Sequence, residues 1–153
     1  MELKRQKKIS RKQLEIIYGS ILSDAYVTKK GQIQFEQGAS QKAYLFWKYR
    51  ELSSISYDNP PNDLDLTDLS LAVWYMDDGW TESGKYFISV EGFGHEYRNS
   101  ILKQLEEKFG ILATIKERGH LNIRSQSIPK FVHTVEPYIF ESLSYKLPNG
   151  SLR

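Results

Sequence analysis

Two aspartates, Asp24 and Asp78, stand at the ends of two apolar segments that repeat one pattern. The first segment, residues 17–25, reads IYGSILSDA, and the second, residues 71–79, reads LAVWYMDDG. Each predicts a helix that ends in an acid followed by a small residue, although a carboxylate opposes the helix dipole at that end. A bound cation would compensate for this unfavourable placement at both positions.

The repeat also predicts that the two carboxylates meet. Small residues such as Gly19, Ser23 and Ala72 let two helix backbones approach closely, so the two helices can pack side by side about a pseudo-twofold axis. Two carboxylates a few ångströms apart repel each other unless a divalent cation lies between them. Such oxygen ligands suit Mg²⁺ and favour metal-assisted phosphodiester hydrolysis. The alternative is that both acids merely end helices in solvent.

Composition limits the classes of protein to which this chain can belong. Its 153 residues are 40% hydrophobic, which suits one domain or two small fused halves. The absence of cysteine excludes disulfide scaffolds, thiolate metal sites and cysteine nucleophiles, and is compatible with an intracellular protein. No apolar run is long enough to span a membrane or to mark a signal peptide, so no membrane partner is expected.

Charge is unevenly distributed, although the formal net charge is only +2. Residues 1–12 carry six basic residues and one acidic residue, while residues 56–70 carry four aspartates and no basic residue. The basic arm, taken as residues 1–13, could contact a phosphate backbone or could be a solvated terminus. The acidic stretch contains the helix-breaking run NPPN and predicts a linker over residues 58–67.

The periodicity predicts an α+β fold made of two related halves, residues 14–57 and residues 68–153. The elements expected in the first half are a helix opened by a capping box of Ser10 and Gln13, a hairpin within 26–36, and a helix over 42–53. Those expected in the second half are a helix over 69–78 capped by Asp68, strands at 79–81 and 85–90, a helix over 95–109 ended by Gly110, strands at 111–117 and 120–124, a helix over 128–140 and a loop tail. The first half therefore lacks a second hairpin and a last helix.

The two segments resemble the paired motifs of the LAGLIDADG homing endonucleases, in particular the single-chain, intron-type members. LAVWYMDDG is similar to their second motif and IIYGSILSDAYV to their first, and the likeness extends to YKLP at residues 145–148. The resemblance implies a duplicated αββαββα unit, with the motif helices packed at the interface and the sheets forming a saddle over the DNA major groove.

The same resemblance implies roles for individual residues. Asp24 and Asp78 match the residues that hold the metal, expected to be Mg²⁺ or another divalent cation such as Mn²⁺, or Ca²⁺ in a crystal. Lys146 matches a basic residue near the active site, which can lower the pKa of the attacking water or offset phosphate charge. Asp77 is not at the ligand position, and we interpret it as a helix-end polar residue, with a supporting role beside the metal ligands as the alternative.

Polar residues on the predicted strand faces suit contacts with double-stranded DNA. Glutamine can bond to adenine edges, arginine can bond to guanine, and all of these polar types can hold phosphates. The candidates are Thr28, Lys30, Gln32, Gln34, Glu36, Lys85, Ser89, Lys116, Arg118, Asn122 and Arg124. The alternative is an ordinary solvated sheet face, and we interpret His95 and His120 as surface polar groups.

Only 54 positions separate Asp24 from Asp78, so the first half has room for one hairpin and one helix. We therefore expect a shortened half, whose smaller DNA footprint the basic arm or self-association could compensate. The predicted function is that of a Mg²⁺-dependent, site-specific DNA endonuclease of homing type. The alternatives are an RNA-splicing maturase or a non-cleaving DNA-binding protein on the same fold and, apart from the resemblance, an unrelated α+β structural domain.

Overall fold

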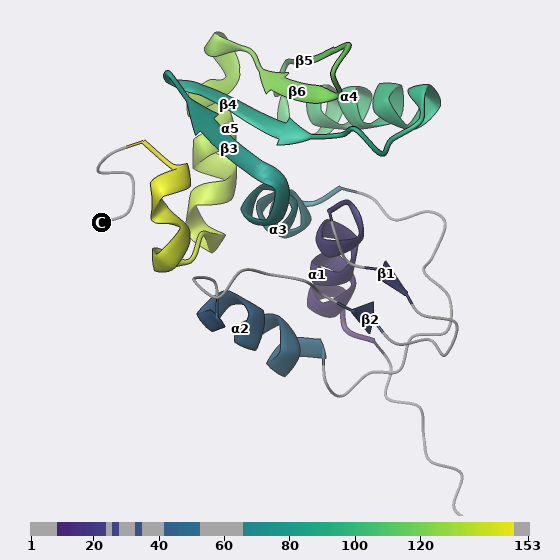
Figure 1. The fold of residues 1–153 in the computed structure, drawn as a ribbon, viewed down its shortest axis with the longest axis vertical. Helices are drawn as coiled ribbons and strands as arrows, with labels where there is room; N and C mark the ends of the chain where they lie inside the picture. Colours follow the sequence, from purple (N-terminus) through teal and green to yellow (C-terminus); the bar gives the residue numbers. More distant parts are fainter. Residues whose placement is uncertain (1–8, 24–25, 28–32, 35–41, 53–65, 149–153) are drawn as a thin grey trace, which may run out of the picture.

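A computed structural model of the chain describes residues 9–23, 26–27, 33–34, 42–52 and 66–148 (Figure 1). The elements of the first half are α1 (Arg11–Ile21), β1 (Tyr26–Val27), β2 (Ile33–Gln34) and α2 (Lys42–Leu52). Those of the second half are α3 (Asp68–Asp78), β3 (Gly79–Glu82), β4 (Lys85–Ser89), α4 (His95–Phe109), β5 (Ala113–Lys116), β6 (His120–Ile123), α5 (Ile128–Val135) and the 3₁₀ helices η2 (Ser125–Ser127), η3 (Glu136–Tyr138) and η4 (Glu141–Lys146). The observed order of helices and strands confirms the predicted α+β class.

The first half is described in part. Strands β1 and β2 pair antiparallel, with Tyr26 opposite Gln34 and Val27 opposite Ile33, which confirms the predicted hairpin. Helix α2 confirms the next predicted helix. Helix α1 begins within the stretch assigned to the basic arm, and the predicted linker lies almost wholly outside the described residues.

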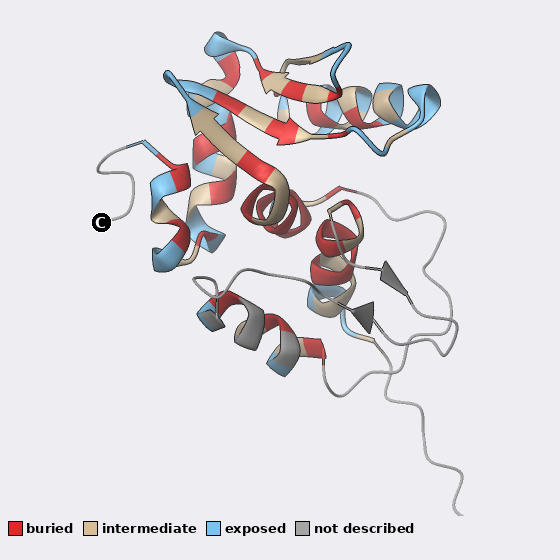
Figure 2. Ribbon diagram, in the orientation of Figure 1, coloured by how far each residue is buried: buried red, intermediate tan, exposed pale blue. Residues whose placement is uncertain are grey.

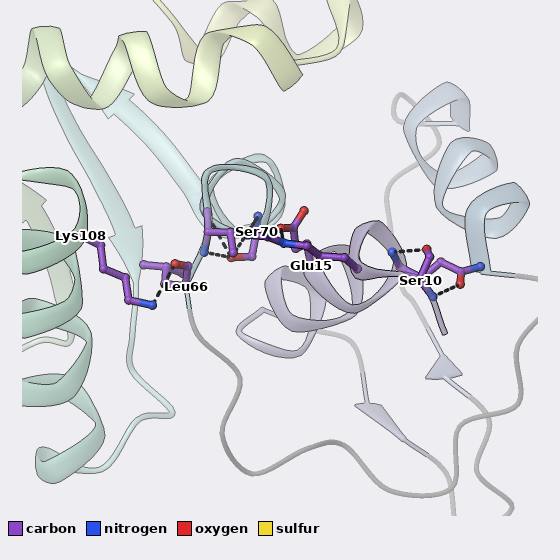
Figure 3. A network of polar contacts seen from close by, with 8 residues as sticks. Ser10, Glu15, Leu66, Ser70 and Lys108 are labelled. Carbon is purple, nitrogen blue, oxygen red and sulfur yellow. Dashed lines mark hydrogen bonds and ion pairs between the residues drawn. The ribbon is translucent and has the colours of Figure 1, made fainter. Parts of the chain in front are cut away.

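The two helices that carry the repeated segments, α1 and α3, are called the motif helices, and both begin at capping boxes. The backbone N–H of Gln13 donates to Oγ of Ser10 over 3.2 Å, and the Gln13 side chain accepts from the Ser10 N–H over 2.9 Å, as predicted. In α3 the matching pair is Thr67 and Ser70, with bonds of 2.7 and 3.2 Å (Figure 3). The expectation that Asp68 caps α3 is wrong, because Thr67 already satisfies the exposed amide and Asp68 is the first helical residue.

The four-stranded sheet of the second half is antiparallel, in the order β3-β4-β6-β5. Ile88 pairs with Leu121, and both are fully buried in the core that α3, α4 and α5 also build. Phe87 pairs with Asn122, and both point to the opposite face, where they are partly exposed. This opposite face is called the open face of the sheet.

Helix α3 lies at the centre of the molecule. Its residues from Leu69 to Met76 are all buried, and Figure 2 shows α3 coloured as buried over most of its length. Helix α1 packs along one side of α3, while α5 and strands β3 and β4 contact it elsewhere. A helix buried on all sides is apolar all round, which explains the uninterrupted apolar run of the second motif.

The C-terminal part differs from the prediction. The expected single helix over 128–140 is wrong: α5 ends at Val135, and η3 follows it, because Pro137 lacks the N–H that a continuing α-helix needs. The expected loop tail instead contains η4, which ends at Lys146. None of the described helices is long and apolar enough to serve as a membrane span.

Candidate active site and nucleic-acid interface

The motif helices lie in close contact at Gly19. A Cβ atom built on Gly19 would lie 2.7 Å from Val73 Cβ and 2.9 Å from Val73 Cγ1, and it would also overlap the carbonyl oxygen of Ser70. These separations are shorter than van der Waals contact, so glycine is the residue that fits here. Gly19 and Val73 hold equivalent places in the repeated segments, 54 positions apart. The predicted close packing of the two motif helices is therefore confirmed.

A hydrogen bond joins the C-terminal ends of the same helices. Ser23, just beyond α1, donates from Oγ to Oδ2 of Asp77 over 2.5 Å. These two residues are also 54 positions apart, and each stands directly before one of the predicted metal ligands. Asp78 is the last residue of α3 and is partly buried, whereas Asp24 lies outside the described residues. The meeting of the two carboxylates therefore stays a prediction.

Lys146 reaches the end of α3 from the C-terminal part of the chain. Its side chain is buried, and Nζ donates to the carbonyl oxygen of Met76 over 2.6 Å. The hydroxyl of Tyr75 donates to the carbonyl oxygen of Lys146, also over 2.6 Å. Burial lowers the pKa of Lys146, and the negative charges of Asp77 and Asp78 oppose that shift. The basic residue matched from the family thus lies at the helix end that Asp78 occupies.

A second lysine, Lys48 of α2, is buried at this helix end, and the sequence did not predict it as a site residue. Its Nζ donates to Oδ1 of Asp77 over 2.8 Å and to Oδ2 over 2.7 Å, and the two side chains are 1% and 5% exposed. Asp77, a polar residue at the helix end as interpreted from the sequence, thus forms a buried ion pair there.

The aromatic residue one turn before Lys48 completes this cluster. The ring centroid of Tyr44 lies 4.6 Å from Lys48 Nζ, and its hydroxyl donates to the carbonyl oxygen of Val73 over 3.4 Å. Burial raises the pKa of Tyr44 well above its usual value, and the charge of Asp77 adds to the shift. The signal that could have revealed the cluster is a lysine placed four residues after a tyrosine, on the aromatic face of a predicted helix.

The structure places the candidate DNA-contacting residues of the second half on or beside the open face of the sheet. Those on its strands are Lys85, Ser89, Lys116 and Asn122. Arg118 lies in the β5–β6 turn and Arg124 lies just after β6, and both are exposed. The Oδ1 atom of Asn122 is buried and has no hydrogen-bond partner among the described residues.

The candidates of the first half are less fully described. Those outside the described residues are Thr28, Lys30, Gln32 and Glu36, and of Gln34 only the place in β2 is described. Their proposed contacts with DNA therefore stay predictions.

Aromatic side chains share the open face with the polar candidates, and the sequence did not predict them. Trp80 and Phe87 stack with their ring centroids 5.3 Å apart, and His120 meets Trp80 edge-on at 4.9 Å. The His120 ring also lies 3.2 Å from a carboxylate oxygen of Glu91. Within the described ranges, no three His, Cys, Asp or Glu residues are grouped so that they could hold a metal.

The two halves of the chain each match the same protein-family profile. The profile of the LAGLIDADG DNA endonuclease family matches residues 14–65 and, a second time, residues 62–131. This chain belongs to the LAGLIDADG DNA endonuclease family. The first match includes most of α1 and the second includes all of α3, so the internal repeat of the sequence is a repeat of the family's own unit.

Curated proteins similar to this LAGLIDADG chain differ in their named activities. The chain is 26% identical to the cytochrome b mRNA maturase bI2 of Debaryomyces hansenii, over 94% of this chain and 76% of the maturase. It is 30% identical to the probable intron-encoded endonuclease 1 of Wickerhamomyces canadensis, over 82% of this chain and 58% of that protein. It is also 24% identical to Protein RecA of Mycolicibacterium flavescens, over 92% of this chain and 47% of that protein. The chain thus spans about half the length of several relatives that it matches.

A solved structure shares the fold of this LAGLIDADG chain. It is the homing endonuclease I-WcaI bound to its DNA recognition sequence, with a TM-score of 0.74 and 21% identity, over 92% of this chain and 87% of that chain. This likeness confirms the predicted LAGLIDADG-type architecture. The maturase alignment extends over 199 positions, more than the 153 residues of this chain, so the maturase carries additional residues inside the matched region.

Proposed function

We propose that this chain is a site-specific DNA endonuclease of homing type, which hydrolyses phosphodiester bonds with a divalent metal held by Asp24 and Asp78. The observation that carries the proposal is the hydrogen bond between Ser23 and Asp77. It joins the two motif helices at the residues that directly precede the proposed ligands. Asp24 and Asp78 come directly after these two residues in the sequence. We therefore expect their carboxylates to lie close together and to share one cation site.

The donors present at this helix end fit a hard divalent cation. Carboxylate oxygens suit Mg²⁺, which leaves coordination positions for water and phosphate oxygens. Lys48 and Ser23 engage both oxygens of Asp77, which supports Asp78 as the ligand on α3. When bound, the metal would supply an activated water and stabilise the leaving 3′-oxygen.

Lys146 is proposed to assist through its charge. Its ammonium group donates to the carbonyl oxygen of Met76, at the negative end of the α3 dipole, close enough for Asp77 and Asp78 to raise its pKa. A positive charge at this place offsets the charge of an approaching phosphodiester and favours deprotonation of the attacking water.

Double-stranded DNA is the proposed partner, bound on the open face of the sheet. Lys85 and Lys116 supply charge for phosphates, and the partly exposed amide side chain of Asn122 is of a type that bonds to base edges. The fold neighbour I-WcaI is bound to its DNA recognition sequence, which supports the same class of partner. The first-half candidates, the basic arm and self-association are proposed to extend this footprint.

An RNA-splicing maturase is the second candidate function. It is favoured by the similarity to a maturase that covers 76% of that protein's length. The presence of Asp24 and Asp78 does not distinguish DNA cleavage from RNA splicing, because one fold supports several functions. A non-cleaving DNA-binding protein would share the open face and lack the chemical step.

The test begins with selection of a bound sequence from a randomised duplex library. Cleavage of that sequence in Mg²⁺ is then measured for the wild type, Asp24→Asn, Asp78→Asn and the control Asp68→Asn, which removes an exposed acid from the other end of α3. We expect both ligand variants to lose cleavage and to retain DNA affinity, and the control to cleave like the wild type. Wild-type cleavage by either ligand variant would contradict the proposed metal site. Splicing of an intron RNA without DNA cleavage would select the maturase.

A further inference from the structure

The carboxylate of Asp77 connects three parts of the chain at the end of α3. Lys48 of α2 bonds to both of its oxygens over 2.7 and 2.8 Å, and Ser23, just beyond α1, bonds to Oδ2 over 2.5 Å. Helix α2 lies on the side of the motif helices away from the sheet (Figure 1). The first half therefore reaches the end of α3 through two polar side chains that meet on one carboxylate.

The position of this cluster points to a role beyond folding stability. A buried ion pair costs desolvation energy, and replacing it by apolar residues is often neutral or even stabilising. Here the pair is nearly inaccessible to solvent and stands one residue before a proposed ligand in α3, while Ser23 stands one residue before the other. Hydrogen-bonded groups outside the coordination sphere commonly orient metal ligands, and this cluster fixes the two residues that directly precede the proposed ligands.

The two buried lysines approach this helix end from different halves of the chain. Lys146 comes from the C-terminal segment and bonds to the carbonyl oxygen of Met76, whereas Lys48 comes from α2 and bonds to Asp77. Two positive charges thus lie beside the two acids that end α3. The shortened first half contributes its cation from α2.

We propose that Lys48 is a positioning residue, which acts through Asp77 and Ser23 to set the separation of the motif-helix ends and hence of Asp24 and Asp78. The inference rests on the proposed endonuclease function and deepens it. In this role Lys48 is buried against Asp77 and acts on the metal site without being one of its ligands. Its loss should therefore slow the chemical step and weaken metal binding while leaving DNA affinity unchanged.

The test uses variants that distinguish the effect of an unbalanced buried charge from the loss of the contact between Lys48 and Asp77. Lys48→Met alone leaves Asp77 buried without its cation, and Asp77→Asn alone leaves the cation without its carboxylate, so either variant can fail to fold. The double variant Lys48→Met with Asp77→Asn removes both charges and is expected to unfold at a urea concentration close to that of the wild type. Lys103→Met is the matched control, because it removes an exposed lysine from an i,i+4 pair with Glu107 on α4.

Three measurements follow for each folded protein, with selected duplex DNA as the substrate. They are DNA affinity in the absence of metal, the single-turnover cleavage rate in saturating Mg²⁺, and the affinity of the protein–DNA complex for Mn²⁺, measured by electron paramagnetic resonance. We expect the double variant to bind DNA within about two-fold of the wild type and to lose about 10- to 100-fold in cleavage rate and in Mn²⁺ affinity. The Lys103→Met control should match the wild type in all three.

Three further outcomes keep the inference separate from the endonuclease proposal. A double variant that folds and retains wild-type cleavage and Mn²⁺ affinity would overturn the positioning role and leave an ion pair that serves only folding. If the wild type does not cleave, the endonuclease proposal fails, and the Mn²⁺ affinities still decide the inference. If the double variant does not fold, Ser23→Ala removes the cross-helix bond without changing charge, and unchanged cleavage and Mn²⁺ affinity in that variant would equally overturn it.

Discussion

The close approach of the motif helices predicts a marked loss of stability from one added methyl group. In Gly19→Ala the new Cβ would lie 2.7 Å from Val73 Cβ and would also overlap the carbonyl oxygen of Ser70. A backbone oxygen cannot rotate away as a side chain can, so one motif helix must shift relative to the other. Such a shift would also change the separation of the two helix ends.

The expected size of the loss follows from two opposing effects. Overpacking a well-packed core costs about 1–3 kcal/mol, whereas replacing a helical glycine by alanine gains about 1 kcal/mol in helix propensity. Because the overlap at Gly19 involves backbone as well as side chain, we take the cost at its upper end and expect a net loss of about 2 kcal/mol in the free energy of unfolding. For a chain of this length, that loss lowers the Tm by roughly 4–8 °C.

Urea unfolding and thermal unfolding of Gly19→Ala measure the effect directly. The matched control is Gly92→Ala, since a Cβ built on Gly92 meets nothing within 4 Å, and a change within about 0.5 kcal/mol is expected there. If Gly19→Ala proved more stable than the wild type by about 1 kcal/mol, helix propensity alone would decide the outcome. The motif helices would then not touch at Gly19, and the reasoning would be refuted.

Two other predictions concern ionisation and DNA binding. Above about pH 10, where tyrosines of the unfolded chain lose their protons, we expect the free energy of unfolding to fall as pH rises, because burial raises the pKa of Tyr44, Tyr75 and Tyr86 in the folded chain. The unfolded chain then binds fewer protons than the folded chain. Urea unfolding at several pH values should show that the free energy of unfolding of Tyr75→Phe falls less steeply with pH than that of the wild type, by about 1.4 kcal/mol per pH unit. Equal slopes would contradict burial of that hydroxyl. Alanine at Lys85 or Lys116 should weaken binding to all duplex sequences and reduce the salt dependence of log affinity by about one, and an unchanged salt dependence would remove that lysine from the interface.

Features set by neighbouring residues could be predicted from the sequence. The capping box of Ser10 and Gln13 opens α1 as expected, because both partners lie within one turn. Helix α4 spans His95–Phe109 as predicted, and Gly110 ends it with a left-handed backbone at φ 64°. The repeat of the two motif segments likewise predicted the pairing of α1 and α3.

Features that depend on distant residues could not be predicted in the same way. Lys48 stands on an aromatic helix face, and nothing in its own helix shows that a carboxylate 29 positions later will neutralise it. The partners of Asp77 could not be predicted for the same reason, since they come from two other elements. The open-face aromatic pair of Trp80 and Phe87 depends on the strand register, which alternation alone does not fix.

The proposed endonuclease function depends on one cation site shared by the ends of the motif helices. The most direct measurement is the anomalous scattering of Mn²⁺ in crystals of the protein bound to its selected DNA duplex. We predict a peak within coordination distance of carboxylate oxygens from both Asp24 and Asp78, next to the DNA backbone. A peak that touches neither acid, or two carboxylates that point away from each other and from the DNA, would contradict the account.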